Sequence, residues 1–91
     1  MALYEKYSLK ALQLGMKEVG MKQESQTIIN TYCELSTELS RTNWKQVAEK
    51  LGMPTDGHSR NRITSTLTAA AVAYRNLLYA PVGYVVRNPE D

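Results

Sequence analysis

The side chains best suited to contact another molecule are concentrated in the segment Ser59-Arg60-Asn61-Arg62, with Ser65 and Thr66 close behind it. Arginine donates paired hydrogen bonds to guanine, and asparagine pairs in the same bidentate way with adenine. Serine and threonine hydroxyl groups bond readily to phosphate oxygens. A segment that combines these groups therefore favours hydrogen bonding to nucleic acid.

Helical spacing divides the candidate residues into two sets. One set is expected to face base edges in the major groove of DNA and consists of Asn61, Arg62 and Ser65. The other set is expected to contact phosphate and to fix the register of the protein, and it consists of Lys45, Ser59, Arg60 and Thr66. Together these residues form the predicted nucleic-acid-binding site.

The two arginines are unfavourably placed for an ordinary helix. Arg60 and Arg62 lie in the first turn of a helix predicted to begin near Ser59, where the macrodipole favours negative charge. Two cations there, with Asn61 between them, indicate that a negative partner is expected. The alternative is that these arginines, like Lys45, are solvated side chains on a helix surface.

Residues suited to catalysis or metal binding are scarce. His58 and Cys33 are the only histidine and the only cysteine, whereas a metal site needs several such ligands at suitable spacing. No glycine-rich loop ends in the Lys-Ser/Thr pair that binds phosphate. Glu34 and Glu38, one turn apart, are interpreted as a solvated helix face and not as an acid–base pair. We therefore expect no enzymatic activity, no cofactor and no metal.

The two single residues have structural interpretations. Cys33 flanks the apolar stripe of its predicted helix, so we interpret it as a small buried apolar side chain and not as a reactive thiol. His58 is interpreted as a loop residue beside a helix start. Donation from His58 to a phosphate group is the alternative.

The composition describes one small folded domain. The chain has 91 residues, of which 43% are apolar and 22% are charged, as is typical of globular proteins. No apolar run is long enough to cross a bilayer, and the charged residues near the N-terminus do not fit a signal peptide. A single cysteine fits a reducing compartment, so we expect a cytoplasmic protein with no membrane contact.

Positive charge is concentrated in the second half of the chain. Residues 1–40 contain four lysines against five glutamates, whereas residues 41–87 contain seven lysines and arginines against Glu49 and Asp56. Clustered positive charge is typical of a surface that contacts the phosphate backbone. The alternative is the chance asymmetry of a small domain.

Apolar spacing and turn residues predict a mainly α fold. The predicted elements are helices at 8–22, 25–40, 43–52 and 59–79, a loop at 53–58 and a short strand at 84–87. Ser8 and Thr42 or Asn43 are expected to cap the first and third helices, which Gly20 and Gly52 end. Gly15 is expected to weaken the middle of the first helix.

Each longer helix has an apolar stripe that predicts its buried side. In the second helix the stripe consists of Ile28, Ile29, Tyr32, Leu35 and Leu39. In the last helix it consists of Ile63, Leu67, Ala70, Ala71, Tyr74, Leu77 and Leu78, and the opposite side presents Asn61, Arg62, Ser65, Thr68, Ala69, Val72 and Asn76. The small residues on that second side would let a partner approach the helix backbone closely.

The domain organisation follows from these elements. Residues 1–91 are predicted to form one domain, in which 25–87 is the core and 88–91 is a polar tail. Residues 1–24 are expected either to join this core or to form an N-terminal arm or a dimerisation helix. A chain of this size often gains stability by dimerising.

The run Val47-Ala48-Glu49-Lys50-Leu51-Gly52 resembles the first helix of helix-turn-helix motifs in bacterial and phage regulators. Ala48 and Gly52 match the small residue and the turn glycine of that motif, and Ile63 matches the apolar residue that closes its core. The loop from Met53 to His58 is longer than the compact turn, which is similar to winged helix-turn-helix regulators. The resemblance, which covers residues 43–87, implies a DNA-binding function with the C-terminal strand as a minimal wing.

The sequence therefore predicts a small transcriptional regulator that binds double-stranded DNA as a homodimer. The start of the helix at 59–79 would enter the major groove. The alternative is a phage-type adaptor or inhibitor that binds a protein through Ala69 and Val72 and through the tyrosines Tyr79 and Tyr84. A structural subunit without a ligand is the third interpretation.

Overall fold

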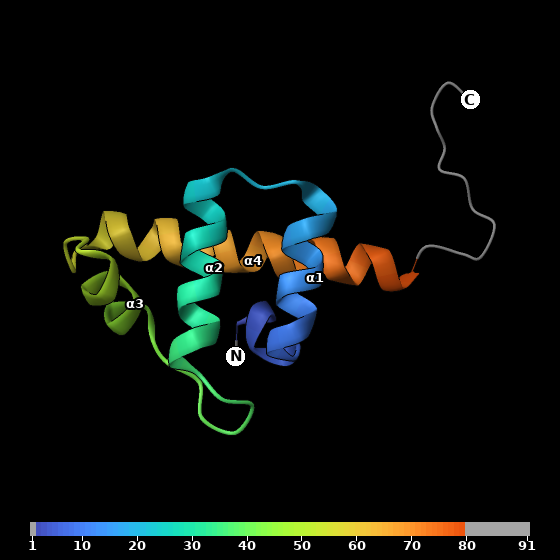
Figure 1. The fold of residues 1–91 in the computed structure, drawn as a ribbon, viewed down its shortest axis with the longest axis horizontal. Coiled ribbons are helices and arrows are strands. Elements are labelled where there is room, and N and C mark those ends of the chain that lie inside the picture. Colours follow the sequence, from blue (N-terminus) through green and yellow to red (C-terminus); the bar gives the residue numbers. More distant parts are fainter. Residues whose placement is uncertain (1, 80–91) are drawn as a thin grey trace.

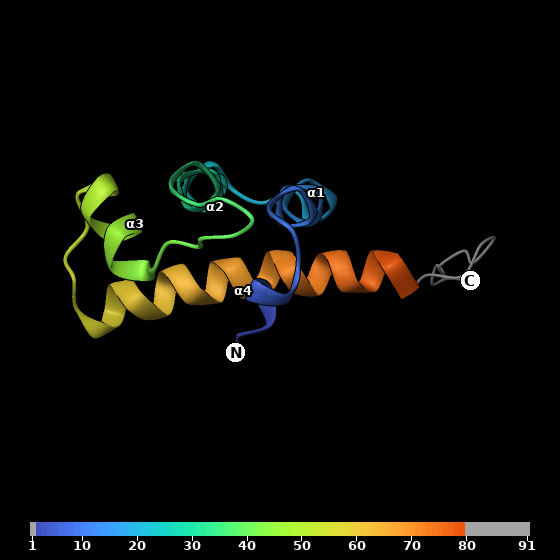
Figure 2. The same cartoon turned by 90° about the horizontal axis from the view of Figure 1, so that it is seen from below.

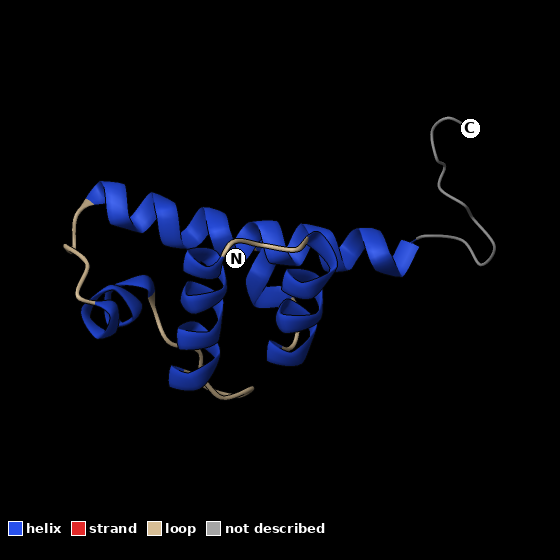
Figure 3. Cartoon of the chain, turned by 45° about the horizontal axis from the view of Figure 1, so that its top comes forward, coloured by secondary structure: helices blue, strands red, loops and turns tan. Residues whose placement is uncertain are grey.

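The computed structural model describes residues 2–79, which form a mainly α fold, as the sequence predicts (Figure 3). The elements are the 3-10 helix η1 (Leu3–Lys6) and the α-helices α1 (Leu9–Val19), α2 (Gln23–Leu35), α3 (Trp44–Leu51) and α4 (Gly57–Tyr79). Within this range there is no strand. The strand predicted at 84–87, and with it the minimal wing, lies outside the described residues.

The long helix α4 is the element on which the others pack (Figure 1). The antiparallel hairpin of α1 and α2 lies across one side of it, and α3 packs beside its N-terminal end (Figure 2). The 3-10 helix η1 also contacts α4. Side chains from all four α-helices meet in one core, whose largest fully buried members are Tyr32, Leu12, Ile29, Ile63, Leu67 and Val47.

Local capping determines where α1 and α3 begin and end, as predicted. The Ser8 side chain accepts a hydrogen bond from the Ala11 backbone N–H, and Asn43 forms a reciprocal capping box with Gln46. Both helices then end at glycines in the left-handed conformation, Gly20 with φ of 65° and Gly52 with φ of 72°. Glycine adopts this conformation without the steric penalty of a Cβ atom.

The prediction that α2 continues to residue 40 is wrong, because the helix ends at Leu35. Thr37 and Ser40 then exchange backbone hydrogen bonds across a tight turn. Leu39, which the helical stripe placed in the core, is 99% exposed at this turn. The turn brings Glu38 and Arg41 into tertiary contacts that a continued helix would not allow.

The loop predicted at 53–58 is also too long, because α4 begins at Gly57. Asp56 caps this helix, since its Oδ1 accepts a hydrogen bond from the Ser59 N–H at 2.9 Å and its carbonyl accepts one from the Arg60 N–H. The connection between α3 and α4 is therefore the segment 52–56. It is closer in length to the compact helix-turn-helix turn than the sequence indicates.

The crossing of α1 over α4 brings two backbones into contact. A Cβ atom added to Gly15 would lie 2.1 Å from the Ala70 carbonyl oxygen and 3.1 Å from the Tyr74 backbone nitrogen. Ala70 and Ala71 are both fully buried, and their small side chains allow the backbones of α1 and α4 to come close. Gly15 lowers the intrinsic helix propensity of α1, but it allows the two helices to touch.

Candidate nucleic-acid interface

The side of α4 that faces away from the core is partly exposed within residues 2–79. Ile63, Leu67, Ala70 and Ala71 on the inner side are at most 1% exposed. On the outer side Asn61, Ser65, Ala69 and Asn76 are exposed, and Thr68 and Val72 are half-buried. We call these six residues the outer face of α4. These side chains are polar or small, and Arg62, which the helical period places on the same side of α4, adds a positive charge beside them.

The cap of α4 places a carboxylate directly at the helix N-terminus. Hydrogen bonds from Ser59, the backbone N–H first, lower the pKa of the Asp56 carboxyl, so the group stays ionised at neutral pH. A negative charge at this end is favourable for the helix macrodipole. Asp56 therefore offsets part of the unfavourable placement of Arg60 and Arg62.

A second carboxylate lies against Arg62 itself. The Arg62 Nη2 donates to Glu24 Oε1 in the first turn of α2, with 2.5 Å between the two atoms. The Arg62 side chain is 46% exposed and that of Glu24 is 77% exposed. The sequence indicates a negative partner for this arginine, and Glu24 of the same chain is one. Glu24 occupies one donor of Arg62, the arginine expected to face base edges.

The remaining predicted residues differ in accessibility. Lys45 and Arg60 are exposed, as contact with phosphate requires. Ser59 is only 2% exposed, beneath the cap formed by Asp56, so it offers almost no surface to a partner. Thr66 is half-buried and its hydroxyl donates to the carbonyl oxygen of Arg62 at 2.8 Å. Of these predicted residues, Asn61, Ser65, Arg60 and Lys45 are therefore exposed, and Ser59 is buried.

A groove of about 560 Å³ borders the Glu24–Arg62 ion pair. It lies between the first half of α2, the connection from α3 and the first turns of α4. Its wall is partly apolar, through Ile28, Leu51, Met53 and Pro54, and partly polar, through Gln23, Glu24, Thr27, Asp56, His58, Ser59 and Arg62. The groove combines a concave surface with charged groups beside the outer face of α4.

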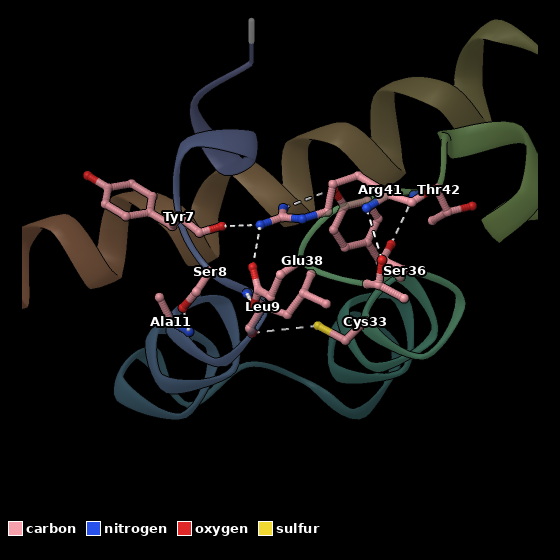
Figure 4. A network of polar contacts seen from close by, with 12 residues as sticks. Tyr7, Ser8, Leu9, Ala11, Cys33, Ser36, Glu38, Arg41 and Thr42 are labelled. Carbon is pink, nitrogen blue, oxygen red and sulfur yellow. Dashed lines mark hydrogen bonds and ion pairs between the residues drawn. The ribbon is translucent and has the colours of Figure 1, made fainter.

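A polar network around Arg41 lies away from this groove and is structural (Figure 4). The Arg41 Nη2 donates to the Tyr7 carbonyl at 2.6 Å and to Glu38 Oε1 at 3.2 Å. Glu38 Oε2 accepts from the Leu9 N–H at 2.8 Å, at the N-terminus of α1. These bonds join the turn after α2 to the start of α1. Glu38, predicted to be solvated, is therefore a tertiary contact.

Cys33 also belongs to this region and has no feature of a reactive thiol. Its sulfur donates to the carbonyl oxygen of Leu9 with a separation of 3.7 Å. Burial raises the pKa of the Cys33 thiol, so the thiol remains protonated at neutral pH. Both observations agree with the interpretation of Cys33 as a packing residue.

Sequence reasoning missed Glu24 and Asp56, the two carboxylates of the site. Asp56 has a readable signal, because an aspartate three residues before Ser59 has the spacing of an N-cap and its N3 residue. Glu24 has none, since the contact joins residues 38 positions apart. Within residues 2–79 no group of histidine, cysteine, aspartate and glutamate side chains could hold a metal ion.

Comparison of the chain with protein-family models, with curated proteins and with solved structures found no match. In the part of the chain from residue 2 to residue 79, no helix is both long enough and apolar enough to span a bilayer.

Proposed function

We propose that this protein binds double-stranded DNA by inserting the first half of α4 into the major groove. The observation that carries the proposal is the outer face of α4, which begins with Asn61 and Ser65, both exposed within residues 2–79. A helix with its side chains is about 10–12 Å across, which fits a major groove about 12 Å wide. The hairpin of α1 and α2 packs on the core side of α4, and its connection lies beside Ser65 and Ala69 at one edge of the outer face.

The proposed contacts follow from exposure. Asn61, Ser65 and Arg62 would meet base edges, and Arg60 and Lys45 would bind phosphate groups. In this arrangement α3 and α4, joined by the turn at Gly52, act as the two helices of a helix-turn-helix motif. Ser59 is omitted because it is buried, and Thr66 because its hydroxyl is bonded to its own helix.

We further propose that the protein is a transcriptional regulator that acts as a homodimer. Two copies would place two α4 helices on half-sites about 34 Å apart, one turn of the duplex. The exposed apolar residues at the end of α4, Leu77 and Leu78, support contact between copies. Size-exclusion chromatography with light scattering measures the oligomeric state, and a monomer at micromolar concentration would contradict the dimer alone.

Anisotropy titration of a labelled random duplex at several salt concentrations tests DNA binding. Arg60→Gln and Arg75→Gln form a matched pair, because both remove one exposed arginine from α4, near its start and near its end. We expect the Arg60 change to lower affinity for every sequence and to reduce the salt slope by about 1, whereas the Arg75 change has little effect. Absence of duplex affinity at low salt would refute the proposal.

A second candidate function, binding to a protein, is favoured by one observation. Leu77, Leu78 and Tyr79 are 44%, 55% and 77% exposed at the end of α4, next to each other along the chain. Exposed apolar and aromatic side chains are typical of protein interfaces. The two functions differ in their salt response, because an apolar interface changes little over a range of salt that weakens DNA binding strongly.

A further inference from the structure

We propose that Glu24 competes with DNA for the guanidinium group of Arg62 and thereby lowers the affinity for non-specific DNA. This inference rests on the proposed DNA-binding function and deepens it. It assigns a regulatory role to a residue of α2, which lies outside the helix-turn-helix pair.

The geometry of the contact makes Glu24 a substitute for a DNA group. Arg62 Nη2 and Glu24 Oε1 are 2.5 Å apart, and this is the one side-chain hydrogen bond that Arg62 makes within residues 2–79. A carboxylate and a phosphate present the same pair of anionic oxygens to a guanidinium. Arg62 can therefore bind either Glu24 or a DNA phosphate with the same donor.

The exposure of the pair makes the exchange easy. With side chains 46% and 77% exposed, Arg62 and Glu24 form a surface ion pair. Such pairs contribute little to folding. Glu24 also lies in the first turn of α2, where the helix macrodipole favours its negative charge without Arg62. Loss of the ion pair to DNA would leave Glu24 in a favourable place.

The cost of breaking the ion pair is the same on random and preferred sequences, but the contact that replaces it differs. On a random duplex Arg62 would exchange one carboxylate for one phosphate, so Glu24 cancels part of the gain. On a preferred sequence Arg62 would exchange it for a bidentate contact with guanine, which is worth more than the exposed ion pair. Glu24 therefore lowers both affinities by about the same factor, and the net gain that remains is larger on a preferred sequence.

Glu24→Gln tests this inference, with Glu34→Gln as the matched control. Both changes remove one exposed carboxylate from α2, but Glu34 lies near the other end of the helix. In anisotropy titrations with a random duplex at low salt, Glu24→Gln should tighten binding about two- to fivefold, the range that an exposed ion pair spans. Glu34→Gln should change the affinity less.

The Arg62→Gln background separates competition from simple repulsion between Glu24 and DNA. If Glu24 acts through Arg62, the effect of Glu24→Gln should fall in that background to the effect of Glu34→Gln. An unchanged effect would overturn the inference, because Glu24 would then act by its own charge. Equal effects of the Glu24 and Glu34 changes in the wild-type background would overturn it as well.

Failure of the underlying function has a different signature. If neither the wild type nor any variant binds the duplex at low salt, DNA binding itself is refuted and the competition with it. If the wild type binds and only the Glu24 effect is missing, the DNA-binding proposal stands and the competition is refuted. Circular dichroism melting of every variant confirms that the compared proteins are equally folded.

Discussion

The two helices of the α1–α2 hairpin lie against the same long helix but contact it in different ways. At Gly15, α1 meets the α4 backbone directly, with no room for a Cβ atom. Near its start, α2 reaches α4 through an exposed ion pair beside a groove. Tight backbone contact allows few substitutions, whereas an exposed side-chain pair can exchange partners. The α1 contact therefore holds the hairpin closely on α4, and the start of α2 offers a charged group that can change its partner.

Gly15→Ala should disrupt the contact between α1 and α4 and should lower the free energy of unfolding more than the other variants. An added methyl group would lie 2.1 Å from the Ala70 carbonyl oxygen, so the helices must separate, and we expect a loss of about 3 kcal/mol, the upper part of the range for overpacking. Chemical denaturation followed by circular dichroism measures this loss.

Gly57→Ala is the control for Gly15→Ala. A Cβ atom at Gly57 meets nothing within 4 Å, so this change should be neutral or stabilise the protein by up to about 1 kcal/mol. The two substitutions are chemically identical, but only Gly15→Ala should destabilise the fold. A stabilising effect of Gly15→Ala would contradict the close crossing.

Arg41→Gln tests the polar tie between the hairpin and the N-terminal segment. Glutamine is too short to reach both the Tyr7 carbonyl and Glu38, the partners of the Arg41 Nη2. We expect the free energy of unfolding to fall by about 1–1.5 kcal/mol. Arg75→Gln, at an exposed arginine of α4, should leave it nearly unchanged, and an equal effect of both changes would argue against the network.

Glu24→Gln should have a smaller effect on stability than Gly15→Ala or Arg41→Gln. The Glu24 side chain is 77% exposed, and exposed pairs contribute on the order of 0.5 kcal/mol. Thermal melting in low and moderate salt measures this contribution, which salt should reduce. A loss above about 2 kcal/mol would mean that the α2 side is as important for folding as the α1 crossing.

Asp56→Asn should change the pH dependence of the free energy of unfolding. At neutral pH it should have the smallest effect of these variants. Because the folded-state pKa of Asp56 is lowered, its ionisation stabilises the fold above the unfolded value of about 3.9. That contribution is lost as the pH falls through the lowered folded value. Asparagine caps helices about as well but does not titrate, so the variant should lose less stability than the wild type between pH 7 and pH 3. Equal losses in urea titrations would contradict the role of the carboxylate.

Helix ends were predictable from the sequence where their causes are local. Ser8, Asn43, Gly20 and Gly52 act on backbone groups within a few residues, so capping rules are sufficient to locate them. The end of α2 depends instead on tertiary bonds of Glu38 and Arg41. Apolar spacing alone therefore extended that helix to residue 40.

The candidate site was predictable only in part for the same reason. The helical period correctly placed Asn61 and Ser65 on the exposed side of α4. It could not reveal that Glu24 pairs with Arg62, because that contact depends on how α2 folds back on α4. The burial of Ser59 follows from the earlier helix start at Asp56, a capping signal that the loop prediction overlooked.

Because α1 and α4 are in close contact at Gly15, a rotation of α4 about this crossing would displace the ends of the helix. Asn61 lies nine residues before Ala70, about 13 Å along the helix axis. A tilt of α4 by about 5° at the crossing would move Asn61 by about 1 Å, more than the spread of about 0.5 Å in hydrogen-bond distances. A change in how α1 packs on α4 would therefore alter the contacts of Asn61, about 13 Å away along the helix.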